Sequence, residues 1–317
     1  MKILVVGAGA VGSLFAARLT SAGYSVELVG RPDAVAAIRS HGLRVEGSGA
    51  GTFRPAAIPD VREASLPDAV LLAVKTFSLP IAASALAARF PRLRPTLLPQ
   101  NGLGIEETVR AALPRGTDAD PAPWLVRAVN SVPATLVGPG VVRQAGSGEL
   151  VLRDPALPRP DSAAGEVFRE AFSRAGVRVR LVDDLEREVW RKALVNAAIN
   201  PVTALHRVLN GRLLDPPFRE EARTLLREAQ RAARTAGFEF SDAEADGDLD
   251  RVVRATAENR SSMLQDRERG RPTEIDAISG ELVRTAAAHG LDLPATRAVI
   301  ARLGGPDDRS SGRAQSS

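Results

Sequence analysis

The fold of the first half of this chain can be inferred from the sequence Gly7-Ala8-Gly9-Ala10-Val11-Gly12. An apolar run over residues 3–6 precedes it and predicts a β-strand, and a helical pattern over residues 11–22 follows it. A G-x-G-x-x-G sequence between a strand and a helix is typical of dinucleotide-binding domains. The opening of the chain therefore predicts a strand, a phosphate-binding turn and a helix.

Each glycine of this turn has a separate physical task. Gly7 permits the tight turn, Gly9 lets the backbone approach a pyrophosphate, and Gly12 lets the helix pack close to the strand. The anion then lies on free N–H groups at the start of the helix. A glycine-rich turn that binds no ligand is the alternative. The predicted cofactor-binding residues of the turn are Gly7, Gly9, Ala10, Val11 and Gly12.

Short apolar runs continue to alternate with helical patterns through the first half of the chain. Such an alternation indicates βαβ units and a parallel sheet that is covered by helices on both faces. We therefore expect a doubly wound sheet. Its further strands are predicted over residues 26–29, 69–74 and 96–99, and its further helices over residues 34–40 and 81–90.

The pattern changes between Trp124 and Arg153, where the helical period disappears. Runs over residues 141–144 and 150–153, punctuated by Gly and Pro, predict antiparallel strands that close the sheet. A helix over residues 162–175 and a strand over residues 177–182 complete this part of the prediction.

From residue 185 onward, long helical segments replace the strands. We predict an α/β Rossmann-type doubly wound domain over residues 1–183 and an all-helical domain over residues 184–304. The remaining residues, 305–317, are Gly, Ser, Asp and Arg with almost nothing apolar, so we expect a disordered tail.

Composition excludes several classes of function. The 317 residues contain no cysteine, which excludes disulfides and thiolate chemistry, and the three histidines have no metal-ligand spacing, so no metal is expected. Aromatic residues make up only 4%, too few to stack bases, and the net charge is only +4, so nucleic acid is not an expected partner. No apolar run is long enough to span a membrane, and the cytoplasm is the expected compartment.

The choice of cofactor depends on the end of the second predicted strand. Where an NAD-binding domain usually carries an acid for the ribose 2′-hydroxyl, this chain has Gly30, and Arg31 follows it. An arginine can pair with a 2′-phosphate, so we predict NADP(H) over NAD(H). Glu27 is the competing candidate for the ribose, but it lies within the strand instead of at its carboxyl end.

Two further polar side chains follow strands of the predicted sheet. Lys75 comes at the end of the strand over residues 69–74, and Asn101 follows the strand over residues 96–99. Ligands of doubly wound sheets bind outside the carboxyl ends of the strands, so both residues are candidates for the cofactor and the substrate. The alternatives are a solvated lysine and a turn residue before Gly102.

Lysine is rare in this chain, since only three of its 42 basic residues are lysines. Lys192 lies in a helical segment with Asn196 and Asn200 at i, i+4 and i+8, which puts all three on one helix face. An ammonium can release a proton where a guanidinium cannot, and asparagine is a poor helix former. These three residues indicate a polar site, and a solvated face is the alternative.

A second polar cluster follows further along the chain. Asn259 and Ser262 are spaced to share a helix face, and Glu274 opens the next predicted helix. Serine and asparagine can hold a carboxylate, and a glutamate can hold a hydroxyl or the lysine. Glu274 also fits a first-turn acid that the helix dipole favours.

With these motifs, the chain resembles the ketopantoate reductases, the 2-dehydropantoate 2-reductases, to about residue 303. The resemblance implies NADPH-dependent reduction of 2-dehydropantoate to (R)-pantoate. It also implies that Lys192 is the general acid at the ketone and that Glu274 is the partner of the substrate hydroxyl and the lysine. The substrate-binding residues that it implies are Asn101, Asn196, Asn200, Asn210, Asn259 and Ser262, with Ser262 at the carboxylate.

One departure from the family pattern is visible at residues 142–148, Val-Arg-Gln-Ala-Gly-Ser-Gly, where many members have a histidine. The departure leaves room for another 2-keto acid as substrate. A second alternative is a non-catalytic protein that binds NADP as a sensor, which would not require the polar residues of the helical domain. The helical domain is also a candidate interface for a homodimer.

Overall fold

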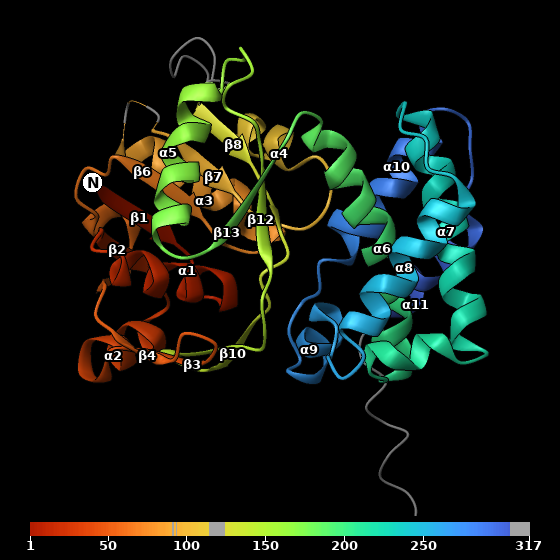
Figure 1. The fold of residues 1–317 in the computed structure, drawn as a ribbon, viewed down its shortest axis with the longest axis horizontal. Coiled ribbons are helices and arrows are strands. Elements are labelled where there is room, and N and C mark those ends of the chain that lie inside the picture. Colours follow the sequence, from red (N-terminus) through yellow and green to blue (C-terminus); the bar gives the residue numbers. More distant parts are fainter. Residues whose placement is uncertain (91, 93, 114–123, 305–317) are drawn as a thin grey trace, which may run out of the picture. The chain divides into compact units, whose positions relative to one another are not determined.

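The computed structural model describes residues 1–90, 92, 94–113 and 124–304. The chain divides into two compact units, of which the first is Met1–Leu185 and the second begins at Glu186 (Figure 1). The boundary predicted after residue 183 lies close to this division. The predicted tail, residues 305–317, falls outside the described residues.

The first unit is built on a sheet of six parallel strands in the order β5-β2-β1-β6-β7-β8. The strand order reverses between β1 and β6, which is where doubly wound sheets bind their ligands. The predicted α/β class is confirmed. The strands are β1 (Lys2–Val6), β2 (Ser25–Val29), β5 (Ala56–Ile58), β6 (Ala69–Leu72), β7 (Thr96–Leu98) and β8 (Leu125–Arg127).

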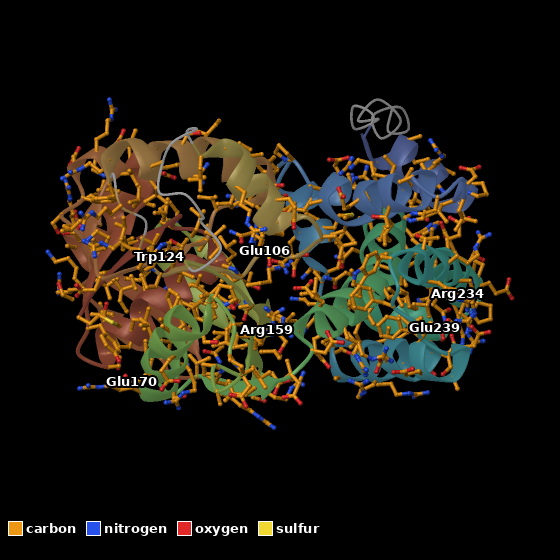
Figure 2. The ribbon with its side chains drawn as sticks, turned by 90° about the horizontal axis from the view of Figure 1, so that it is seen from above. Glu106, Trp124, Arg159, Glu170, Arg234 and Glu239 are labelled. Atoms are coloured by element: carbon orange, nitrogen blue, oxygen red, sulfur yellow. The ribbon has the colours of Figure 1, made fainter. Side chains whose placement is uncertain are left out.

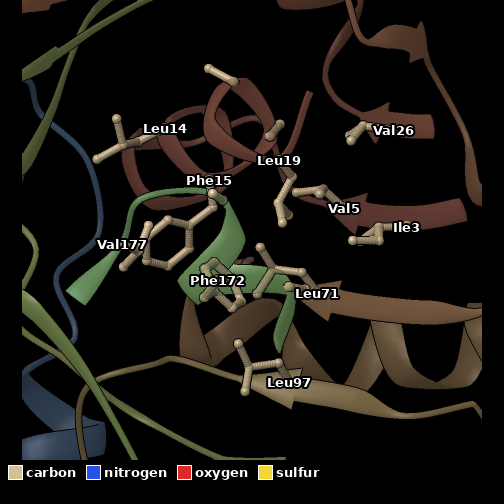
Figure 3. Packing of buried hydrophobic residues seen from close by; sticks show 14 of the residues in the cluster. Ile3, Val5, Leu14, Phe15, Leu19, Val26, Leu71, Leu97, Phe172 and Val177 are labelled. Carbon is tan, nitrogen blue, oxygen red and sulfur yellow. The ribbon is translucent and has the colours of Figure 1, made fainter. Parts of the chain in front are cut away.

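Side chains of each central strand alternate between two hydrophobic cores. In β1, Ile3 and Val5 face one core, and Leu4 and Val6 face the other. Phe15 and Phe172 meet edge to face in the first core, with their ring centroids 4.8 Å apart (Figure 3). The first core includes α1 (Ala10–Ser21), α2 (Pro32–His41) and α5 (Ser162–Arg174), and the second includes α3 (Leu79–Arg89) and α4 (Ile105–Ala112).

Two smaller sheets complete the first unit. One has the order β10-β11-β3-β4 and the other the order β13-β12-β9. Their strands are β3 (Leu43–Gly47), β4 (Gly51–Phe53), β9 (Val129–Asn130), β10 (Ala134–Gly138), β11 (Val141–Gln144), β12 (Glu149–Arg153) and β13 (Arg178–Val182).

The prediction that residues 141–144 and 150–153 close the main sheet is wrong. Both segments are strands, but β11 lies between β10 and β3, and β12 lies between β13 and β9. The last strand of the main sheet is β8, and it is parallel to β7. Glycines and prolines locate the ends of strands, but strand pairing depends on residues far away in the sequence.

The second unit is helical throughout its described residues, as predicted. Ala204, Met263, Ile275 and Leu303 form one of its buried clusters. The α-helices are α6 (Leu185–His206), α7 (Phe218–Thr235), α8 (Asp242–Ala255), α9 (Ser262–Glu268), α10 (Glu281–Ala287) and α11 (Pro294–Gly304), with a 3₁₀ turn at Asn210–Leu214 and a π turn at Asp276–Gly280.

Candidate functional site

The glycine-rich turn between β1 and α1 is closely packed against the protein and leaves the start of α1 uncapped. Gly7 has a φ of +114°, and a Cβ there would lie 2.9 Å from the carbonyl group of Ala73. A Cβ on Gly12 would collide with the carbonyl oxygen of Gly7, whereas a Cβ on Gly9 would meet nothing within 4 Å. Gly9 is also the N-cap of α1, so no side chain caps the first N–H groups of the helix. The turn is close-packed toward the protein and open at Gly9, which fits a phosphate ligand.

The carboxylate of Glu27 has partners inside the first unit. It accepts hydrogen bonds from the backbone N–H of Ser65, at 3.0 Å, and from the Ser65 hydroxyl. Lys2 donates from Nζ to the same hydroxyl oxygen at 2.7 Å, which gives this lysine a structural role. In the sheet register Glu27 lies opposite Leu4 and Ala56, in the middle of its strand.

The end of β2 leaves no room for an acidic side chain at residue 30. A Cβ on Gly30 would lie only 2.7 Å from the Cβ of Ala8 in the glycine-rich turn. Arg31 follows as the N-cap of α2, and its side chain is 72% exposed, with Nε 4.0 Å from the carboxylate of Asp33. A guanidinium is therefore presented at the carboxyl end of the second strand.

The loops after β6 and β7 carry Lys75 and Asn101. Strand β6 ends at Leu72, so Lys75 lies beyond the strand instead of at its end, as the N-cap of the 3₁₀ turn Thr76–Ser78. The loop after β6 approaches the glycine-rich turn, because the N–H of Ala73 donates to the carbonyl of Val6 at 2.8 Å. This places the Lys75 loop beside the turn.

Gln100 joins the two loops and was not singled out from the sequence. Its side-chain Nε2 donates to the carbonyl oxygens of Leu72 and Val74, the latter at 3.1 Å. Because Gln100 is buried and precedes Asn101, it ties the loop of Asn101 to the loop of Lys75. Its position directly before Asn101 was the signal in the sequence.

In the second unit, Lys192, Asn196 and Asn200 all lie in α6 and therefore on one face of it, as predicted. Asn200 is only 5% exposed, and Lys192 and Asn196 are half-buried. A solvated face would leave these side chains exposed. Their burial favours a polar site over that alternative.

A hydrogen bond links α6, one turn after Asn200, to the start of α9. The hydroxyl of Thr203, one turn after Asn200, lies 2.7 Å from Oγ of Ser261. Ser261 is the N-cap of α9 and accepts from the N–H of Leu264 at 3.1 Å. Ser262, the first residue of α9, is thereby held near the Asn200 turn of α6.

The prediction that Asn259 and Ser262 share a helix face is wrong. Asn259 lies in the loop between α8 and α9, because the N-cap Ser261 starts a new helix after it. This loop instead contacts Asn210. The N–H of Asn210 donates to the carbonyl of Asn259 at 3.0 Å, and its Nδ2 donates to Oγ1 of Thr256 at 2.9 Å. Asn210 and Asn259 are therefore brought together.

Glu274 is buried, with 8% of its surface exposed, and it lies directly before the helical residues that lead into the π turn. Its carbonyl accepts from the N–H of Ile278 at 3.2 Å. The neighbouring Ile275 packs in one cluster with Ala204 of α6 and Met263 of α9. A buried carboxylate requires polar partners, which favours a site residue over a solvated helix acid.

The segment that departs from the family pattern has a structural role. Gln144 of β11 is buried, accepts a hydrogen bond from Nη2 of Arg18 in α1 and donates to the carbonyl of Gly146 at 2.9 Å. Its side chain therefore joins a small sheet to α1.

The described residues contain neither a metal cluster nor a membrane-spanning helix. No cluster of three or more His, Asp or Glu side chains there has the arrangement of a metal site. None of the helices there is both long enough and apolar enough to cross a membrane.

Family models match both units of the chain. The model described as "Ketopantoate reductase PanE/ApbA" matches residues 3–156, and the model described as "Ketopantoate reductase PanE/ApbA C terminal" matches residues 184–306. The 2-dehydropantoate 2-reductase of Archaeoglobus fulgidus is 33% identical over 300 residues, which are 94% of this chain and 95% of that protein. The enzyme of the same name from Vibrio cholerae is 32% identical over 96% of this chain and 97% of that protein.

Solved structures agree with these matches. A PanE/ApbA family ketopantoate reductase from Ralstonia eutropha JMP134 has a TM-score of 0.85 and 31% identity over 96% of this chain and 97% of its own. D-Mandelate dehydrogenase, solved with NADH and anilino(oxo)acetate, has a TM-score of 0.84 at 23% identity over 96% of this chain and 97% of its own. The second likeness is one of fold.

Proposed function

The chain belongs to the ketopantoate reductase family, and on this premise we propose that it reduces 2-dehydropantoate to (R)-pantoate with NADPH. The observation that carries the proposal is the match of the two family models, one to each unit of the chain. Whole-length relatives are named 2-dehydropantoate 2-reductase. The protein is accordingly an oxidoreductase that acts on a small keto acid.

Three features support NADP(H) as the cofactor. The turn from Gly7 to Gly12 is open to a pyrophosphate at Gly9. The Cβ of Ala8 leaves no room for an acidic side chain at residue 30, and the carboxylate of Glu27 accepts a hydrogen bond from Ser65. The carboxylate that usually binds a ribose 2′-hydroxyl is therefore missing from the end of β2. The exposed guanidinium of Arg31 is a suitable partner for a 2′-phosphate.

The helical unit supplies the proton donor and most of the substrate-binding groups. NADPH, when bound, provides the hydride for the C2 ketone. Lys192 donates a proton from Nζ to the ketone oxygen, where negative charge develops. Glu274 holds the substrate hydroxyl and the lysine. Substrate binding is assigned to Asn101, Asn196, Asn200, Asn210, Asn259 and Ser262, with Ser262 at the carboxylate, and Lys75 is assigned to the cofactor.

The test is a spectrophotometric assay of the full-length protein. We expect 2-dehydropantoate to cause rapid loss of NADPH absorbance, and we expect a higher KM for NADH than for NADPH. Arg31→Ala should raise the KM for NADPH roughly tenfold or more, because it removes a hydrogen bond between charged groups, and should leave the KM for NADH unchanged. Equal KM values for both cofactors in the wild-type protein would contradict the NADP preference.

Two alternatives predict other outcomes of the same assay. A reductase for another substrate would turn over a different member of a panel of branched, straight-chain and aromatic 2-keto acids. A non-catalytic sensor would bind NADPH tightly and turn over none of them. The polar residues of α6, of which Asn200 is buried and Lys192 and Asn196 are half-buried, argue against the sensor, because nucleotide binding to the first unit does not require them.

A further inference from the structure

Arg127 is a buried arginine at the carboxyl end of the main sheet. It is the last residue of β8, and only 6% of its side chain is exposed. Its Nη1 donates to the carbonyl oxygen of Leu98 at 2.9 Å and to that of Ala128 at 3.2 Å, and its Nη2 donates to the carbonyl oxygen of Gly102 at 2.9 Å. The guanidinium thus bridges from its own strand to the neighbouring strand β7 and to the loop that follows it.

The charge of Arg127 is balanced within the same unit. Glu106, labelled in Figure 2, lies in the first turn of α4, and its Oε2 is 3.7 Å from Nε of Arg127. Burial of a guanidinium is unfavourable unless carbonyl or carboxylate oxygens surround it. Three backbone carbonyls and one carboxylate meet this requirement, so the side chain is held in one orientation.

The two carbonyls on β7 and its loop enclose the segment that carries Asn101. Leu98 is the last residue of β7, and Gly102 is the residue after Asn101, with a φ of +100° that favours glycine. Arg127 therefore fixes both ends of residues 99–101. Gln100 ties the middle of this segment to the loop of Lys75. The position of the Asn101 side chain depends on these contacts.

We propose that Arg127 is a positioning residue for the reaction, which holds Asn101 in the place where it binds its ligand. The proposal rests on the proposed function, in which Asn101 contacts substrate or cofactor. The fork of the guanidinium is essential, because two nitrogens must reach two carbonyls on opposite ends of one turn. A lysine would keep the charge but could not donate in this planar geometry.

The first experiment tests the clamp without any turnover. Hydrogen exchange of the full-length protein, in the absence of ligands, is measured for the wild type and for Arg127→Lys. We expect faster exchange in the variant at the backbone amides of residues 100–104 and unchanged exchange at the glycine-rich turn. Unchanged exchange at residues 100–104 would overturn the clamp, whatever substrate the enzyme uses.

The second experiment measures kinetics for Arg127→Lys, Asn101→Ala and the double variant. We expect Arg127→Lys to lower kcat/KM by roughly 10- to 100-fold, the scale of a misplaced binding group. In the Asn101→Ala background the same substitution should have little further effect, because the group that it positions is gone. Multiplicative effects in the double variant would overturn the proposal, since a merely structural arginine would act independently of Asn101.

Arg89→Lys is the matched control. Arg89 of α3 also donates to two backbone carbonyls, those of Arg62 at 3.2 Å and Ala64 at 2.7 Å, but these precede β6 and lie away from its carboxyl end. We expect wild-type kcat/KM in this variant. Absence of keto-acid turnover by the wild type would contradict the proposed function, and the exchange experiment would still decide whether Arg127 holds the loop.

Discussion

Two polar stripes in the helical unit have the same spacing and different chemistry. The lysine–asparagine stripe of α6 consists of Lys192, Asn196 and Asn200, and the aspartate stripe of α8 consists of Asp242, Asp246 and Asp250. Each stripe places its residues at i, i+4 and i+8 on one face of a helix. Spacing alone therefore does not distinguish a functional site from a structural contact.

Ion pairs to α7 account for the aspartate stripe. Asp250 pairs with Arg219 at 3.0 Å, and Asp246 pairs with Arg227 at 2.7 Å and with Arg223 at 3.3 Å. Arg227 also lies 3.6 Å from Asp242, so three arginines at the same spacing on α7 pair with the three aspartates. Asparagines cannot form such a ladder, because they carry no charge. Residue type and burial, in addition to spacing, therefore distinguish a functional site from a contact between helices.

The sharpest test of this difference compares two adjacent cations of α6. Lys192→Ala should lower kcat by roughly 10²–10⁴, the range for a positioned general acid, and leave the affinity for NADPH unchanged. Arg191→Ala is the control, because Arg191 pairs with Glu244 at 3.2 Å and with Asp248 at 3.3 Å and so joins α6 to α8. We expect this control to lower the melting temperature and to keep a wild-type kcat.

Steady-state kinetics measures kcat for both variants, and thermal unfolding measures their melting temperatures. A kcat near the wild-type value for Lys192→Ala would remove this lysine from its role. An equal loss of kcat in both variants would mean that α6 contributes to activity only by stabilising the fold.

A smaller effect is expected for the asparagines. Asn196→Ala should lower kcat/KM for the keto acid by about tenfold, because loss of a hydrogen bond to a bound ligand costs about 1–3 kcal/mol and 1.4 kcal/mol corresponds to a factor of ten. Asp250→Asn, on the aspartate stripe, is the control and should leave kcat/KM unchanged. A loss of kcat/KM in the control that equals the loss in Asn196→Ala would abolish the distinction between the stripes.

A substitution in the aspartate stripe should lower the free energy of unfolding and leave kcat unchanged. Asp246→Ala removes the partner of Arg223 and Arg227, which are both partly exposed, so we expect a loss of about 1 kcal/mol in the free energy of unfolding. Urea denaturation measures the loss, and the assay should give a wild-type kcat. High salt should reduce the difference between the variant and the wild type, because salt screens partly exposed pairs.

Local chemistry explains which parts of the fold and the site were predictable. The glycine-rich turn was predictable because Gly7 and Gly12 meet local backbone constraints within one motif. The placement of β11 and β12 was not, because each of them also pairs with a strand that is distant in the sequence, β11 with β3 and β12 with β13. A local signal could have corrected the error at Asn259, since Ser261 has the residue type of an N-cap and starts a helix between Asn259 and Ser262.

Arg127 shows a different limit. The chain has 39 arginines, 42 basic residues less three lysines, and nothing near Arg127 in the sequence separates it from the others. Its importance comes from burial and from carbonyls of β7 and the following loop, which only the folded chain brings to it. Residues that act by holding others are therefore the ones that motifs miss.

The smallest expected effect concerns the pH dependence of the contact between the two striped helices. Glu244 of α8 accepts a hydrogen bond from Arg187 of α6 at 2.8 Å, and this bond lowers the pKa of the carboxyl group below its ordinary value of 4.5. The stabilisation is therefore fully present above pH 4.5 and is lost as the pH falls through the lowered pKa. Glu244→Gln should be less stable than the wild type at neutral pH, and the difference should shrink in acid. Thermal unfolding across this range measures it. A difference that stays constant with pH would mean that the glutamate contributes through packing and not through its charge, and would weaken the view that ion pairs hold α6 to α8.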